Sequence, residues 1–186
     1  MKRSTFTLRR LCEGAIFVAL AQILGYVKLF ELPQGGSITP AMLPLILFSC
    51  RWGFAPGVAA GTLFGLLQLV LDGAYAWGWI SILFDYLFAF ALVGFAGLCR
   101  RSRQSLLLGS FAGCFARFLS HFVSGIFFVA GTASFDIYSI HTESACLYSA
   151  IYNGSYMLPT ALLSALLGLL LQKPLGRYLR REDLSA

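Results

Sequence analysis

Long apolar runs separated by short polar or basic segments dominate the sequence. A helix needs about 20 mainly apolar residues to cross the hydrocarbon core of a bilayer, and most of these runs reach that length. The pattern therefore predicts an all-α integral membrane protein, a six-transmembrane-helix bundle that forms a single membrane domain over residues 1–186. The predicted spans are approximately 11–30, 37–50, 54–72, 77–99, 105–131 and 147–172.

Two spans carry further local signals. The second is short and contains Pro40 and Pro44, so we expect it to be kinked or partly re-entrant, with protein covering the freed backbone groups. Gly57, Gly61 and Gly65 repeat every four residues in the third span. Small residues at that spacing predict close packing of helix backbones inside the bundle.

Composition and charge agree with a membrane protein. The chain is 58% hydrophobic and 12% charged, with a mean hydropathy of +0.77, which is too little charge to cover a soluble domain. The net charge of +6 is divided into clusters between the apolar runs, a pattern typical of cytoplasmic loops and not of nucleic-acid binding. With both termini in the cytoplasm, twelve of the fourteen Lys and Arg residues lie inside. These are Lys2, Arg3, Arg9, Arg10, Arg51, Arg100, Arg101, Arg103, Lys173, Arg177, Arg180 and Arg181.

The sequence lacks the motifs of disulfide frameworks, zinc sites and P-loop ATPases. The five cysteines (Cys12, Cys50, Cys99, Cys114 and Cys146) are scattered without a CxxC pair, so neither a disulfide framework nor a zinc site is expected. No GxxxxGK[ST] phosphate loop occurs, so the chain does not hydrolyse ATP by that route. We expect no metal and no cofactor.

An ionisable residue at the middle of the membrane costs roughly 2.5–3.5 kcal/mol on insertion scales, and three such residues stand out within the predicted spans. Asp85 lies about 12 Å below the outer end of span four, and His121 about 15 Å below that of span five, at the rise of a helix. Arg117 lies one turn deeper on the face of His121. The three can meet in the outer half of the bundle, although a simple Asp85–Arg117 ion pair that ties two helices together is the alternative.

Aromatic residues surround these positions. Trp77, Ser81 and Asp85 form a stripe at spacing four, leading from the outer surface to the carboxylate. Further polar and aromatic side chains are Tyr75, Trp79, Tyr86, Tyr148, Tyr152, Asn153 and Tyr156. Such residues can serve as a membrane-interface belt, but a carboxylate beneath aromatic rings also suits a flat organic cation. His121 and Asn153 can donate or accept hydrogen bonds to a heteroaromatic ring.

Tyr148 and Asn153 fit this picture less well, because five residues correspond to about 140° around a helix. Both can face one pocket only if Tyr148 precedes the regular helix or the pocket is wide.

Four blocks of sequence, in this order and spacing, carry a resemblance to a known family. They are residues 35–39 with 42–44, residues 85–90, residues 117–122 with Gly125, and residues 148–149 with 152–159. Over nearly its whole length the chain resembles the thiamine-specific substrate-binding (S) component of energy-coupling-factor (ECF) vitamin transporters.

The resemblance implies a six-helix protein of the bacterial plasma membrane that binds thiamine from outside with high affinity and is not an enzyme. Its implied partners are a membrane-embedded coupling protein and two cytoplasmic ATPase subunits. Ala15 and Ala19 resemble the family's docking surface on the first helix, with ordinary helix packing as the alternative.

The resemblance also implies a binding set and roles for its members. The set is Asp85, Tyr86, Arg117, His121, Tyr148 and Asn153, with Tyr75, Gly125 and Trp77. The ligand's rings are expected to stack on Tyr86, His121 and Tyr148. Asp85, held by Arg117, is expected to face the ligand's charge or hydrogen bonds, and Asn153 to read the pyrimidine edge. Loops near 28–38 and 130–146 are expected to close over the site.

The chain departs from the family pattern in two ways. Aspartate stands at Asp85 where the family commonly has glutamate, and neither lid loop contains a tryptophan. Phe30, Phe128 or Phe135 could take the place of a lid tryptophan.

Other functions remain open from the sequence. The same scaffold could bind another vitamin or a thiamine precursor, or the chain could be a stand-alone proton-coupled carrier. A small intramembrane enzyme that uses His121 and Asp85 is disfavoured, because no nucleophile or metal-ligand set accompanies them.

Overall fold

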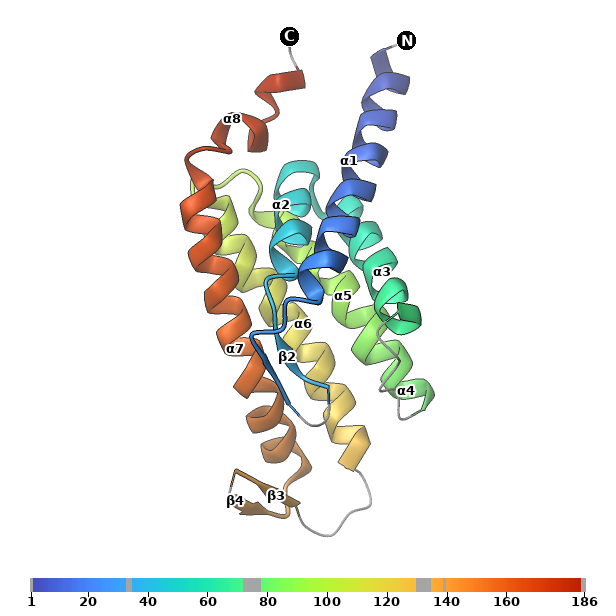
Figure 1. Cartoon of the computed structure of the whole chain (residues 1–186), viewed down its shortest axis with the longest axis vertical. Coiled ribbons are helices and arrows are strands. Elements are labelled where there is room, and N and C mark those ends of the chain that lie inside the picture. Colours follow the sequence, from blue (N-terminus) through green and yellow to red (C-terminus); the bar gives the residue numbers. More distant parts are fainter. Residues whose placement is uncertain (1, 33–34, 72–77, 130–134, 139, 185–186) are drawn as a thin grey trace.

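The computed structural model describes residues 2–32, 35–71, 78–129, 135–138 and 140–184, which form an elongated bundle of helices with both termini at one end (Figure 1). The main helices are α1 (Lys2–Gly25), α2 (Met42–Trp52), α3 (Phe54–Leu71), α6 (Ser105–Val129) and α7 (Ala145–Gln172), and the tail adds α8 (Gly176–Leu179) and η3 (Glu182–Leu184). Between α3 and α6 the chain runs through α4 (Trp79–Ser81), η1 (Ile82–Phe88), α5 (Ala89–Leu92) and η2 (Val93–Cys99).

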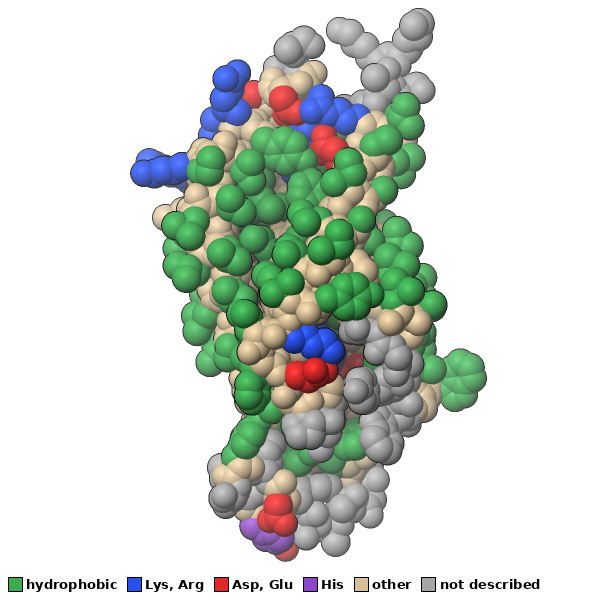
Figure 2. Space-filling view, viewed as in Figure 1, with side chains coloured by type: hydrophobic (Ala, Val, Ile, Leu, Met, Phe, Trp, Pro, Cys, Tyr) green, Lys and Arg blue, Asp and Glu red, His purple; other side chains and the backbone are tan. Residues whose placement is uncertain are grey.

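Four of these segments are long and apolar enough to cross a membrane, namely α3, the continuous segment Trp79–Cys99, α6 and α7. Hydrophobic side chains cover the flank of the bundle, and Lys, Arg, Asp and Glu side chains gather at the end that holds the termini (Figure 2). This distribution is that of an all-α membrane protein, with an apolar belt and charged ends.

Two short antiparallel hairpins, which the hydrophobic pattern does not predict, lie in the half of the bundle away from the termini (Figure 1). β1 (Phe30–Glu31) pairs with β2 (Ser37–Ile38), and β3 (Phe135–Ile137) pairs with β4 (Ile140–Thr142). Gly35 has a φ of 89°, in the left-handed region that glycine adopts without strain, where the first hairpin reverses. The first predicted span therefore ends early, at Gly25, and residues 37–38 are strand and not helix.

The second predicted span differs most from its expected form. The helix α2 begins only at Met42, and all eleven of its residues are buried. Pro40 precedes the helix and Pro44 lies in its first turn, where a missing N–H costs no hydrogen bond. Neither proline therefore removes a hydrogen bond from the helix, and α2 is a short helix enclosed by protein.

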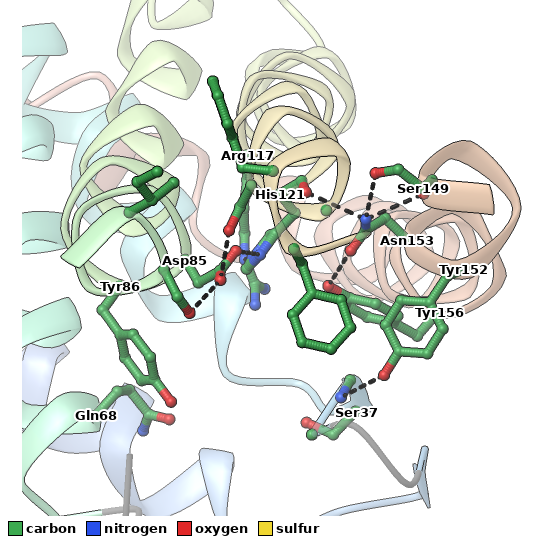
Figure 3. A pocket seen from close by; sticks show the side chains of 18 of the residues that line it. Ser37, Gln68, Asp85, Tyr86, Arg117, His121, Ser149, Tyr152, Asn153 and Tyr156 are labelled. Carbon is green, nitrogen blue, oxygen red and sulfur yellow. Dashed lines mark hydrogen bonds and ion pairs between the residues drawn. The ribbon is translucent and has the colours of Figure 1, made fainter. Parts of the chain in front are cut away.

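The close packing predicted for the glycines of α3 is confirmed. A Cβ on Gly61 would meet the backbone carbonyl of Phe90, and one on Gly65 would meet that of Tyr86. These contacts hold the segment 79–99 directly against α3, which brings Tyr86 beside Gln68 (Figure 3).

The segment that carries Asp85 is a π-helix, η1, and not a regular α-helix. The Ser120 hydroxyl of α6 donates a hydrogen bond of 2.6 Å to the backbone carbonyl of Phe84 within it. A hydroxyl from a neighbouring helix that donates to a backbone carbonyl competes with the helix's own hydrogen bonds and can distort it. π-Helical turns of this kind are frequent at functional sites.

A buried ionic cluster joins three parts of the chain at the terminal end. The fully buried Arg51 side chain of α2 donates from Nε to the Glu13 carboxylate of α1 (2.7 Å) and from Nη2 to the Asp183 carboxylate of the tail (2.9 Å). Its guanidinium lies 3.7 Å from the ring centroid of Tyr178. The hydrogen bonds from Arg51 lower the pKa of Asp183. We call Glu13, Arg51, Tyr178 and Asp183 the terminal clasp.

Replacement of Arg51 by glutamine tests the clasp. The substitution removes the charge that compensates Glu13 and Asp183, and breaking a buried ion pair typically costs about 3–5 kcal/mol. We expect the thermal midpoint of the purified chain in detergent to fall clearly below that of the parent. Arg177→Gln is the control, since Arg177 is 87% exposed in its pair with Glu182. Equal melting of both variants would contradict the assigned role of Arg51.

Candidate ligand-binding site

A cavity of about 430 Å³ lies in the half of the bundle away from the termini, which is within the range of about 300–1,000 Å³ usual for small-molecule sites. Its walls come from the β1–β2 hairpin, α3, the segment 79–99, α6 and α7. Figure 3 shows polar and aromatic side chains pointing into it from these separate elements.

Asp85 forms the polar centre of the cavity. Its Oδ2 accepts hydrogen bonds from the hydroxyls of Ser81 and Ser124, both at 2.7 Å, and its Oδ1 lies 2.9 Å from Nδ1 of His121. An ionised carboxylate has about four lone-pair positions. Three are taken by the protein, so the carboxylate is fixed in orientation and retains capacity for one further donor.

His121 links Asp85 to Arg117. The Arg117 Nε lies 3.2 Å from Nε2 of His121, and a guanidinium can only donate. Nε2 must therefore accept, which places the proton of a neutral imidazole on Nδ1, from where it is donated to Asp85. The three side chains form one directed chain of hydrogen bonds, Arg117 to His121 to Asp85 (Figure 3).

This arrangement corrects the expected contact between Asp85 and Arg117. Among the described residues, the ring that pairs with the Asp85 carboxylate is that of His121. Arg117 contacts His121 and does not bond directly to Asp85. The Arg117 guanidinium instead lies 4.5 Å from the ring centroid of Phe90, a cation–π contact. The direct ion pair fails because the imidazole occupies the space between the two charges.

Aromatic rings line the wall formed by α7. The rings of Tyr148 and Tyr152 stack with centroids 6.3 Å apart and an angle of 3° between their planes. Tyr156 meets Tyr152 edge to face at 5.9 Å and His121 at 6.1 Å. Flat, electron-rich faces in this density suit a planar or cationic ligand.

Asn153 is held more tightly than the sequence suggests. Its Nδ2 donates to the backbone carbonyls of His121 (3.2 Å) and Ser149 (3.0 Å), and its Oδ1 accepts from the Tyr156 hydroxyl at 2.9 Å. Its amide therefore ties α7 to α6, and only the remaining lone pair of Oδ1 is available to a ligand. Tyr148 and Asn153 both line the cavity although Tyr148 lies within regular α7, so the width of the cavity accounts for their spacing.

Some of the remaining expected site residues line the cavity, and others lie outside the described residues. Tyr86 and Gly125 line the cavity, and a Cβ on Gly125 would meet the Ser149 hydroxyl, so the absence of a side chain there lets α6 and α7 approach. Phe128 lines the cavity, and Phe30 is 57% exposed on the hairpin. Tyr75, Trp77 and the Phe135 side chain lie outside what the structure describes.

Other lining residues were not predicted. Ser124 lies seven residues after Arg117, on the same helix face, and that spacing could have identified it. Gln68 is a lone amide in an apolar helix, bonded to Gln22 at 3.0 Å, and its polarity in a membrane span is a usable signal. Lys28 and Glu31 form a 2.7 Å ion pair near the cavity mouth that no sequence pattern distinguishes from ordinary loop charges.

Comparisons with known proteins point in one direction. A family model described as thiamine transporter protein matches residues 11–179. The thiamine transporter ThiT of Bacillus subtilis is 33% identical over 93% of this chain and 95% of its own length. That of Lacticaseibacillus paracasei is 30% identical over 86% of this chain and 85% of its own length. A solved structure of ThiT from Listeria monocytogenes is similar with a TM-score of 0.79 at 28% identity, covering 93% of this chain and 98% of that one.

Gly36 tests how tightly the β1–β2 hairpin is seated on the cavity. Its N–H donates to the Tyr152 hydroxyl at 3.3 Å, and an added Cβ would lie 2.6 Å from Cδ1 of Tyr156, whose buried ring is held by Asn153. We expect Gly36→Ala to destabilise the chain by about 1–3 kcal/mol, as overpacking does, seen as a lower thermal midpoint. The control is Gly154→Ala in α7, where nothing lies within 4 Å and alanine should stabilise the helix by about 0.5–1 kcal/mol. A Gly36→Ala chain as stable as the Gly154→Ala chain would show that the hairpin is not seated this closely.

Proposed function

Because the chain belongs to the thiamine transporter family, whose members are membrane transport proteins and not enzymes, we propose that it is the thiamine-binding S component of an ECF-type importer. It is a multi-pass protein of the bacterial cell membrane. In the proposal, thiamine enters the cavity from the outer face and is delivered inward after the chain joins a coupling protein and two ATPases.

The observation that carries the proposal is the oriented carboxylate of Asp85 below a wall of tyrosines. Thiamine offers a permanent cation and an aminopyrimidine with hydrogen-bond donors. The remaining lone pair of Asp85 accepts one such donor, and the faces of Tyr148, Tyr152 and Tyr86 receive the rings. Aspartate is shorter than the glutamate common in the family, and hydrogen bonds from Ser81, Ser124 and His121 hold its carboxylate at the cavity wall.

The topology forms part of the proposal. We infer six crossings, made by α1, α2, α3, the segment 79–99, α6 and α7, in a single membrane domain with both termini in the cytoplasm. Support comes from the two termini at one end of the bundle and from the Lys and Arg side chains gathered there (Figures 1 and 2). The ligand cavity then opens toward the outside, and in the proposal the loops near 28–38 and 130–146 close over it as a lid.

Asp85→Asn tests the ligand contact. The substitution keeps the shape of the side chain but removes its charge, and a hydrogen bond to a charged group contributes about 1.5–3 kcal/mol. We expect thiamine affinity, measured by isothermal titration on the purified chain, to fall about 10- to 150-fold. Glu182→Gln makes the same carboxylate-to-amide change at the terminal end of the bundle, away from the cavity, and should bind as the parent does.

Unchanged thiamine affinity in Asp85→Asn would exclude the assigned role of Asp85. Competition with pyridoxine, riboflavin and hydroxymethylpyrimidine in the same titration separates thiamine from another vitamin or a precursor. Tighter binding of one of these would transfer the proposal to that ligand on the same scaffold.

Coupling is tested at Ala15 and Ala19, which lie on an exposed face of α1 away from the cavity. Leucine at both positions should block close approach of a partner helix and abolish ATP-driven thiamine uptake by vesicles that contain the coupling protein and ATPases. Thiamine binding by the purified variant should be unchanged. Uptake driven by a pH gradient in vesicles with this chain alone would instead support a stand-alone carrier.

A further inference from the structure

A second cavity, of about 540 Å³, lies at the terminal end of the bundle, far from Asp85. It is bounded by the end of α2, the turn between η2 and α6, the end of α7, and α8 with the residues that follow it. Its twelve lining residues include six arginines and no acid. The arginines are Arg51, Arg100, Arg101, Arg103, Arg180 and Arg181.

Nearby acids pair with two of these six arginines, Arg51 and Arg180. Glu13 and Asp183 bond to Arg51 and Arg9, and Glu182 bonds to Arg180 and lies 3.5 Å from Arg177. Within the described parts of the chain, no salt bridge involves Arg100, Arg101 or Arg103. The cavity therefore carries an excess of positive charge in a concave surface, which concentrates its field.

Two of the arginines are positioned by the fold. Arg181 has a φ of 59°, an uncommon conformation for a non-glycine residue, and its Nε donates to the backbone carbonyl of Arg51 at 2.7 Å. Its guanidinium lies 4.9 Å from the ring centroid of Trp52. Arg100 packs against Gly53, whose φ of 98° requires glycine and where a Cβ would lie 2.9 Å from Nη1 of Arg100.

Neighbouring positive charges act on Arg181. Burial, followed by the charges of Arg100, Arg51 and Arg10, lowers the pKa of this guanidinium. An anion in the cavity would relieve this repulsion.

We propose that this cavity binds a phosphate-bearing anion, supplied either by the headgroup of an anionic phospholipid or by a free phosphorylated solute. A planar guanidinium can donate two parallel hydrogen bonds to a pair of phosphate oxygens. The lining residues Ser102, Ser105 and Gln172 add uncharged polar groups. Basic pockets between helix ends on the cytoplasmic side are typical sites for lipid headgroups.

The apolar surroundings favour the lipid source. Leu98, Leu108 and Leu169, which precede or follow the lining residues by about one turn, are 64%, 46% and 46% exposed. A phosphate held by the arginines would leave acyl chains to lie along these side chains, in the hydrocarbon beside the helices.

The test uses the purified full chain in detergent at about 0.15 M salt, where exposed charges are largely screened beyond about 8 Å. Thermal midpoints are measured against phosphatidylglycerol, phosphatidylcholine and inorganic pyrophosphate. The site variant is Arg101→Gln/Arg103→Gln, since both residues are exposed and their loss leaves the core intact. The control, Lys173→Gln/Arg177→Gln, removes the same charge from exposed residues at this end that do not line the cavity.

We expect phosphatidylglycerol to raise the midpoint saturably in the parent and the control. The site variant should need at least about 10-fold more lipid, because two charge-assisted contacts are lost. The same pattern with pyrophosphate alone would assign the site to a free solute. No saturable response to either anion, or the same response in both variants, would overturn the proposal. Thiamine is absent throughout, so the outcome does not depend on the function proposed above.

Discussion

The chain of hydrogen bonds from Arg117 through His121 to Asp85 is the interaction on which the proposed ligand site depends. An isolated carboxylate within an apolar span would be costly, so neighbouring groups must compensate its charge. The imidazole, which accepts from Arg117, donates to one oxygen of Asp85, while two serine hydroxyls fix the second oxygen. The protein's own side chains thus hold Asp85 in one orientation.

The surrounding fold serves this geometry. The glycines of α3 draw the segment 79–99 inward, and Gly125 does the same for α6 and α7. The Ser120 hydroxyl bonds into the π-helix that carries Asp85. At the opposite end, in the terminal clasp, the buried Arg51 joins α1, α2 and the tail. The bundle therefore has an ionic cluster at its terminal end and a cavity lined by aromatic side chains in its other half.

How far the sequence predicts this structure depends on the range of each interaction. Asp85, Arg117 and His121 could be found because ionisable residues are rare in apolar spans and a spacing of four defines one helix face. The position of Arg51 could not, since its partners Glu13 and Asp183 lie 38 and 132 residues away, and it reads as an ordinary loop cation. The hairpins have strands of two or three residues, too short for an alternating pattern. The π-helix depends on a hydroxyl from another helix.

The central claim, that Asp85 is a charged acceptor oriented through His121, can be tested by ¹⁵N NMR of the imidazole in the purified chain. With only two histidines in the sequence, His121 is assigned by comparison with a His141→Gln chain. The account predicts a neutral ring at neutral pH with its proton on Nδ1, and the same tautomer after thiamine is added. A proton on Nε2, or a doubly protonated ring, would contradict it, because Arg117 could then no longer donate to His121.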